Sequence, residues 1–207
     1  MPAITTPPNA LTTAARVKAN LGITVTDHDA VINQYVAECS EFIENMCNRR
    51  FKRATYTQEL YNGSYADGSA KNCLVLNAAP LVSISLPEYR TGLKSNPNWV
   101  TYPSDNYQEE LAPAIINGRM PAGIQNIRAT YVAGYLIDFT DPYNSTLHTL
   151  PAEISGLCER LVARRFKKRD SEGRTSDGFG GSTVTWGKLI EEADQSILSN
   201  YQRIIIS

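Results

Sequence analysis

Side chains that could bind a metal or act as nucleophiles are few in this chain and widely spaced. The two histidines, His28 and His148, do not form a metal-ligand spacing with cysteine or carboxylate residues. No Ser/His/Asp or Cys/His combination matches the sequence motif of a nucleophilic site. The four cysteines form no C-x-x-C pair, which favours reduced, packed thiols over a disulfide framework; they are Cys39, Cys47, Cys73 and Cys158. The sequence therefore predicts no enzyme, no metal and no cofactor.

The glycine-rich residues 178–188 partly match the sequence motif of a phosphate-binding loop. Gly187 and Lys188 would be the second half of that motif, but Ser182 stands where the first glycine is required. Leu189 follows the lysine, where Ser or Thr is needed to reach magnesium. We therefore expect residues 170–187 to be a mobile, Gly-rich linker.

Charged side chains are segregated along the chain. Residues 20–47 hold five carboxylates and no Lys or Arg, and a basic run follows at 49–53. A second basic cluster covers 160–174. Opposite charges on separate elements can join neighbouring copies, and the predicted interface residues are Glu38, Glu41, Glu44, Arg49, Arg50, Arg53, Arg164 and Arg165. Two alternatives stay open: solvated cations that complement helix C-termini, or cations that face a polyanion such as DNA.

Length and composition limit the class of protein. With 207 residues and 42% hydrophobic residues, the chain can bury the core of one domain with extensions. The net charge of -1 gives no global basic excess for binding nucleic acid or anionic membranes. No leader opens the chain, and no apolar run approaches the roughly 20 residues that span a bilayer, so we expect no membrane contact.

Hydrophobic periodicity predicts helices and strands in separate regions. Apolar residues at three- and four-residue spacing predict helices over 11–21, 27–47 and 151–169, with Thr12 capping the first and Gly22 ending it. Alternation predicts strands around 82–86 and 127–131, and residues 90–112 form an elaborated loop. The fold class is therefore α+β: a helical core with a small, mainly antiparallel sheet and extended terminal arms. The expected segments are a flexible arm at 1–10, a domain at 11–169, the linker at 170–187 and a C-terminal helix and tail at 188–207.

The C-terminal segment carries more apolar residues than a chain end normally exposes. We expect it to dock on a partner or an adjacent copy; the alternative is that it folds back on its own domain. The predicted docking residues are Leu189, Ile190, Ile197, Leu198, Tyr201, Ile204, Ile205 and Ile206.

The order of these features resembles the head-to-tail connector (adaptor) family of tailed bacteriophages. A short helix precedes a longer one that ends in an aromatic-bearing basic segment, ECSEFIENMCNRRF at 38–51. Leu74-Val75-Leu76 then precedes APLVSI at 79–84, IRATYVAGY follows at 127–135, and LPAEI at 150–154 opens a helix that carries Arg164-Arg165. The resemblance covers about 11–169 and 189–203.

This resemblance implies a structural virion protein, assembled in the host cytoplasm and located in the neck. It would form a dodecameric ring beneath the portal protein after genome packaging and would join the next neck or tail component, a stopper or tail terminator. Genomic DNA would pass through the ring without sequence-specific binding, and the C-terminal segment would dock on the portal. The alternative function is a DNA-binding or packaging accessory protein that uses the basic helix.

Overall fold

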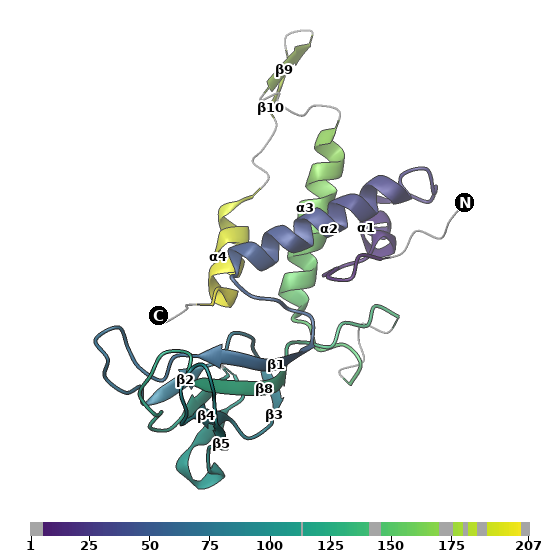
Figure 1. Ribbon diagram of the computed structural model, residues 1–207. Coiled ribbons are helices and arrows are strands. Elements are labelled where there is room, and N and C mark those ends of the chain that lie inside the picture. Colours follow the sequence, from purple (N-terminus) through teal and green to yellow (C-terminus); the bar gives the residue numbers. More distant parts are fainter. Residues whose placement is uncertain are drawn as a thin grey trace. The chain divides into compact units, whose positions relative to one another are not determined.

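The protein is described by a computed structural model over residues 6–112, 114–140, 146–169, 176–179, 182–185 and 190–203. The described residues form α-helices and small antiparallel sheets, which confirms the predicted α+β class (Figure 1). They divide into a helical unit, Met1–Asn48 with Ile137–Arg203, and a β unit, Arg49–Leu136. This division cuts across the domain expected at 11–169, because the chain leaves the helical unit after Asn48 and returns to it at Ile137.

The helical unit is built on one central helix. Helix α3 (Ala152–Lys168) packs against α1 (Ala14–Leu21), α2 (Asp29–Met46) and α4 (Glu192–Tyr201). The predicted helices are confirmed, with ends that differ by one to three residues. None of the helices in the described part of the chain has the length and apolar character needed to cross a membrane.

The apolar stripes of α2 and α3 form the core of the helical unit. Fully buried residues recur at three- and four-residue intervals on both helices; they include Ile32, Val36, Ile43, Ile154, Leu157, Leu161 and Val162. Ser40 Oγ accepts a hydrogen bond from Leu11 N–H at 3.0 Å and lies 3.5 Å from Cys158 Sγ, so the buried hydroxyl has partners. Burial raises the pKa of Cys158 to about 12 and that of Cys39 to about 11, which keeps both thiols protonated and inert.

The start of α1 differs from the sequence prediction by one residue. Thr13, not Thr12, is the N-cap, and its hydroxyl accepts a hydrogen bond from Arg16 N–H at 3.3 Å. Thr12 is buried, and its hydroxyl donates a hydrogen bond to Glu159 at 3.2 Å. The Thr12 hydroxyl therefore contacts another helix instead of capping α1. Gly22 ends the helix as predicted, at a positive φ of 69° that glycine adopts without strain.

The β unit contains two antiparallel sheets. The five-stranded sheet has the strand order β1-β8-β4-β5, and β3 also pairs with β8, which therefore has three partner strands. The second sheet has the order β2-β7-β6. The strands are β1 (Ala54–Tyr61), β2 (Cys73–Val75), β3 (Leu81–Ile84), β4 (Glu88–Arg90), β5 (Trp99–Thr101), β6 (Gln108–Glu110), β7 (Ile115–Asn117) and β8 (Ile127–Ala133). Residues 90–112, predicted as a loop, thus contain β5 and β6, which are too short to show a clear alternation.

Strand β8 is the centre of the β unit and follows the predicted pattern. It buries Ile127, Ala129 and Tyr131 on one face, and the residues between them are half-buried. The alternation expected from Val82 onward is less regular. Leu81 is buried whereas Val82 is 41% exposed, because the register of β3 against β8 shifts between Leu81 and Ser83.

A polar network joins β1 and β8 to the segment after β2. The hydroxyls of Tyr61 and Tyr131 donate to Glu59 at 2.5 and 2.7 Å. They accept hydrogen bonds from the backbone N–H groups of Asn77 and Ala78 at 3.2 and 3.3 Å. Burial raises the pKa of both phenols further above the ordinary value of about 10, so both remain neutral donors near pH 7.

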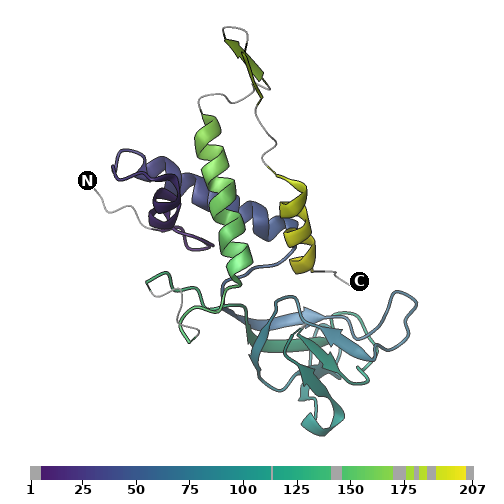
Figure 2. The ribbon, with the colours of Figure 1, turned by 180° about the vertical axis from the view of Figure 1, so that it is seen from behind.

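A β-hairpin lies in the segment predicted to be a mobile linker. Strands β9 (Ser176–Phe179) and β10 (Ser182–Thr185) pair antiparallel, with Phe179 opposite Ser182. Figure 2 shows the two strands as a pair of olive arrows. The two residues between them in the sequence are Gly180 and Gly181, and a two-residue glycine loop is typical of tight hairpins. Because residues 170–187 are rich in glycine, serine and threonine, the sequence analysis interpreted them as a linker and missed the hairpin.

Candidate assembly surfaces

The basic face of α3 is engaged by carboxylates of the same chain. Arg164 forms ion pairs with Asp194, and with Glu191 at 3.1 Å, while Arg160 lies 3.4 Å from Asp194. Asp194 is only 1% exposed and also accepts a hydrogen bond from Glu191 N–H in the capping box of α4. Burial favours the neutral carboxyl, but the hydrogen bonds from Arg164 and Glu191 N–H outweigh it and hold the pKa of Asp194 below its ordinary value. These contacts fix α4 on α3.

The acidic face of α2 is also partly used within the chain. Glu38 forms an ion pair with Arg165 at 2.7 Å, and the Arg165 guanidinium lies 4.9 Å from the centre of the Tyr35 ring. Glu44 is 2% exposed. Of the three acidic residues predicted for contact with a neighbour, Glu41 is therefore the exposed one.

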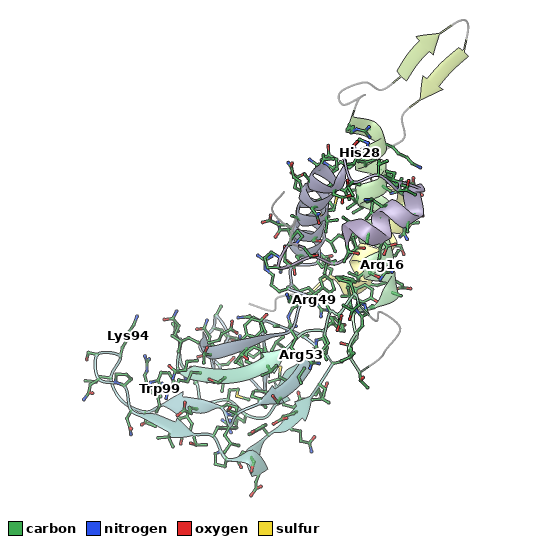
Figure 3. The ribbon with its side chains drawn as sticks, turned by 90° about the vertical axis from the view of Figure 1, so that its right-hand side faces the viewer. Arg16, His28, Arg49, Arg53, Lys94 and Trp99 are labelled. Atoms are coloured by element: carbon green, nitrogen blue, oxygen red, sulfur yellow. The ribbon has the colours of Figure 1, made fainter. Side chains whose placement is uncertain are left out.

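The basic run after α2 opens the β unit. Figure 3 labels Arg49 and Arg53 of this run. The Arg49 guanidinium donates to the Ala79 carbonyl and lies 4.9 Å from the centre of the Phe51 ring and 5.6 Å from that of Tyr135. Arg53 donates its backbone N–H to the Tyr135 carbonyl at 2.8 Å. The buried Nε atoms of Arg49 and Arg53 have no hydrogen-bond partner in the described structure. Arg50 is exposed.

The C-terminal helix docks on its own unit. Leu198 is 4% exposed, and its carbonyl accepts a hydrogen bond from Cys47 Sγ at 3.7 Å. Arg203 N–H donates to the Cys47 carbonyl at 2.8 Å, and the Tyr201 hydroxyl donates to Glu153 at 3.2 Å. Helix α4 therefore packs on the helical core of its own chain; docking of this segment on a partner stays a prediction.

The other predicted docking residues have different positions. Ile190 and Ile197 are half-buried. Leu189, Ile204, Ile205 and Ile206 lie outside the described residues.

The β unit carries most of the exposed large apolar side chains of the described residues, which the sequence analysis did not predict. On the outer face of the five-stranded sheet, the Arg128 guanidinium lies 4.5 Å from the centre of the Trp99 ring, and its Nε lies 2.5 Å from Glu88. Leu60, 50% exposed, is the cross-strand neighbour of Arg128. Seven of the ten exposed large apolar side chains among the described residues belong to this unit: Leu60, Tyr65, Val82, Leu86, Leu93, Leu111 and Ile124. Trp and Arg are among the residues enriched at protein interfaces.

Net charge also differs between the units. Met1–Asn48 with Ile137–Arg203 holds 11 Lys/Arg and 15 Asp/Glu, a net charge of -4. Arg49–Leu136 holds nine Lys/Arg and six Asp/Glu, a net charge of +3. The near-neutral whole chain thus conceals two oppositely charged parts.

Within the described ranges, no group of three or more His, Cys, Asp or Glu side chains could hold a metal ion. The titratable groups described above stabilise packing or lie on surfaces.

The chain matches the head completion protein family over residues 10–204 and belongs to that family. This assignment confirms the resemblance found in the sequence and the class of structural head-to-tail connector. No curated protein matches the chain.

Solved structures share the fold. Chains in the neck of an empty gene transfer agent particle (C6 symmetry) and of a native one (C12 symmetry) each match with a TM-score of 0.51. A chain in the virion of the native gene transfer agent matches with a TM-score of 0.53. Each is 14% identical, and the match covers 99% of this chain and 95% of the other.

Proposed function

We propose that this protein forms a ring of identical copies, a dodecamer, in the neck of a tailed phage or phage-like particle. The ring joins the portal protein to the next neck component, a stopper or tail terminator, after DNA packaging. The family match over 10–204 carries this proposal. The similar folds in gene transfer agent necks with C6 and C12 symmetry support it.

Opposite charge on the two units suits a closed ring. In a cyclic assembly each copy uses one surface toward the preceding copy and a different surface toward the next. We place the exposed Glu41 of one helical unit against Arg50 and Arg53 of the next copy's β unit. Each exposed pair contributes only about 0.2–1 kcal/mol, but every subunit boundary repeats it.

The charge pairs of α3 favour a DNA channel over a DNA-binding role. Arg160, Arg164 and Arg165 face carboxylates of their own chain, which reduces their availability to phosphates. Six to ten phosphate contacts would make DNA affinity fall by about 10³–10⁵ between low and moderate salt. A channel that lets genomic DNA slide during ejection requires few such contacts.

For portal docking we propose the last residues, Ile204–Ser207, rather than α4. Helix α4 is part of the helical core through Asp194 and Leu198, so its removal would damage the fold. A chain that ends at Arg203 should remain folded and should lose portal binding. Retained binding of purified portal by that truncation would exclude this docking site.

Particle purification tests the proposal as a whole. Particles produced with an epitope-tagged copy of this chain should carry the tag at the neck, between the head and the tail. As a control for the rival function, the purified chain should not bind short duplex DNA tightly at moderate salt. Absence of the tag from finished particles, or tight DNA binding with a steep salt dependence, would overturn the proposal.

A further inference from the structure

The β9–β10 hairpin is a small sheet without a third strand in the described structure. Its two strands, of four residues each, pair only with one another. An isolated two-stranded hairpin is marginally stable in water and gains stability from a further strand or a packing layer. The sequence of β10, Ser-Thr-Val-Thr, is rich in residues that favour strands.

Within the described part of the chain, strand β1 has an open edge that could receive such a strand. It is the longest strand of the β unit and lies at the end of the strand order, with β8 as its partner on one side. It contains no Lys or Pro, the residues that commonly protect sheet edges. Thr55, Thr57 and Leu60 are exposed along it.

A bulge limits which part of β1 is suitable. The register against β8 shifts between Tyr56 and Glu59, and Gln58 has a positive φ of 51°, so the edge divides into 54–56 and 59–61. The second part contains the charged Glu59, which already accepts hydrogen bonds from Tyr61 and Tyr131. The first part carries no charge, and its Thr55 can pair with the threonines of β10.

Other edges fit less well. Strand β6 is three residues long and exposes Glu109 and Glu110, two carboxylates beside a hairpin that already holds Asp177. Strand β5 is also only three residues long.

We propose that β10 of one copy adds to the open edge of β1 in a neighbouring copy, along residues 54–56. This strand addition provides main-chain hydrogen bonds between subunits, and ring closure repeats it at every boundary. The proposal rests on the ring described above and names a second contact between its copies, independent of the Glu41 pairing.

Cross-linking in assembled particles tests this contact. The chain with Thr55→Cys and Thr183→Cys, treated with a short bismaleimide, should lose most of its monomer band to dimers and higher multiples under denaturing conditions. The matched control combines Thr183→Cys with Thr101→Cys on the exposed β5 edge and should stay monomeric. Cys73 is a half-buried free cysteine that can also react with the bismaleimide. The single variant Thr183→Cys therefore measures how much cross-linking arises from Cys73.

The outcomes separate the two proposals. If the double-cysteine chain is in the particles but yields only monomer, strand addition is excluded while the neck assignment stands. A cross-link that forms within one chain, seen as a shifted monomer, excludes it too. Absence of the wild-type chain from particles instead overturns the proposed function.

A backbone variant gives a second test. Val184→Pro removes an amide donor from β10, whereas Val184→Ile keeps it. With Val184→Pro added, the 55/183 cross-link in particles should fall at least tenfold, and with Val184→Ile it should persist. Equal cross-linking in both backgrounds would contradict strand addition.

Discussion

The helical unit and the β unit use charged side chains in different ways. In the helical unit, Arg160, Arg164 and Arg165 join α3 to α4 and α2, so charge holds helices of one chain together. In the β unit, Arg128 and Glu88 pair on an outer sheet face beside Trp99, among exposed apolar residues. Charge clusters in a sequence therefore do not by themselves identify an interface, because the fold can neutralise them internally.

The largest expected effect is in the helical core. Leu157 on α3 is fully buried, so Leu157→Ala should lower the free energy of unfolding by about 2–5 kcal/mol. Urea unfolding measures the loss, and hydrogen exchange should show it first in α1–α4. Lys167→Ala, at an exposed position of the same helix, is the control and should change stability by less than about 0.5 kcal/mol. Equal loss of protection in both units would contradict their separate cores.

The charge link between α3 and α4 comes next. Asp194→Asn removes the buried charge opposite Arg164 and should cost about 2 kcal/mol, with faster hydrogen exchange in α4. The folded-state pKa of Asp194 lies below the unfolded value of about 3.9, so its contribution is complete above that pH. It disappears as the pH falls through the folded-state pKa.

The pH dependence of stability and an exposed control variant test whether the charge of Asp194 holds α4. The stability difference between wild type and Asp194→Asn should be present at pH 7 and should shrink toward zero in strong acid. Glu192→Gln, exposed on the same helix, should be nearly neutral. A difference that is the same at pH 7 and in strong acid would show that the carboxylate charge does not hold α4.

In the β unit, the tyrosine network should give a smaller change. Tyr131→Phe removes the donor to Glu59 and leaves the Ala78 N–H without its acceptor, at a cost of about 1–2 kcal/mol. Hydrogen exchange should accelerate in β1 and β8 and stay unchanged in α3. Tyr65 is exposed, so Tyr65→Phe serves as the comparison variant. If Tyr65→Phe destabilises the chain as much as Tyr131→Phe does, the hydrogen bonds of the tyrosine network do not account for the loss of stability.

Surface charge should affect assembly more than folding. Glu41→Lys should change the free energy of unfolding by less than about 0.5 kcal/mol yet reduce incorporation of the chain into particles. Adding Arg50→Glu, at the exposed predicted partner position, restores opposite charges and should recover part of the loss. Lys94→Glu, an exposed site elsewhere in the β unit, is the charge control. If the Glu41→Lys chain is incorporated into particles as well as the wild-type chain, Glu41 does not contribute to the interface.

Long periodic elements were predictable from the sequence, and short ones were not. Helices α2 and α3 contain several turns of apolar spacing, so their positions were correct to within two residues. Strands β5 and β6 have three residues each, too few to separate alternation from chance. The β9–β10 hairpin was missed because its glycine pair was interpreted as part of a linker.

The candidate surfaces were predictable only in part, because pairing depends on tertiary placement. Arg164 and Asp194 are 30 residues apart, and no local pattern indicates that they meet. The placement of half-buried Trp99 and exposed Leu60 beside Arg128 likewise depends on strand register, which the sequence pattern left open. The order of degenerate motifs nevertheless identified the family, because it reflects the whole chain rather than any one contact.

The most direct test of the central claim is a cryo-electron microscopy reconstruction of the neck of particles that contain this chain. We predict a ring of twelve copies between portal and next neck component, in which the helical unit of each copy contacts the β unit of its neighbour. A neck without this chain, or a ring in which helical units contact only helical units, would contradict the account.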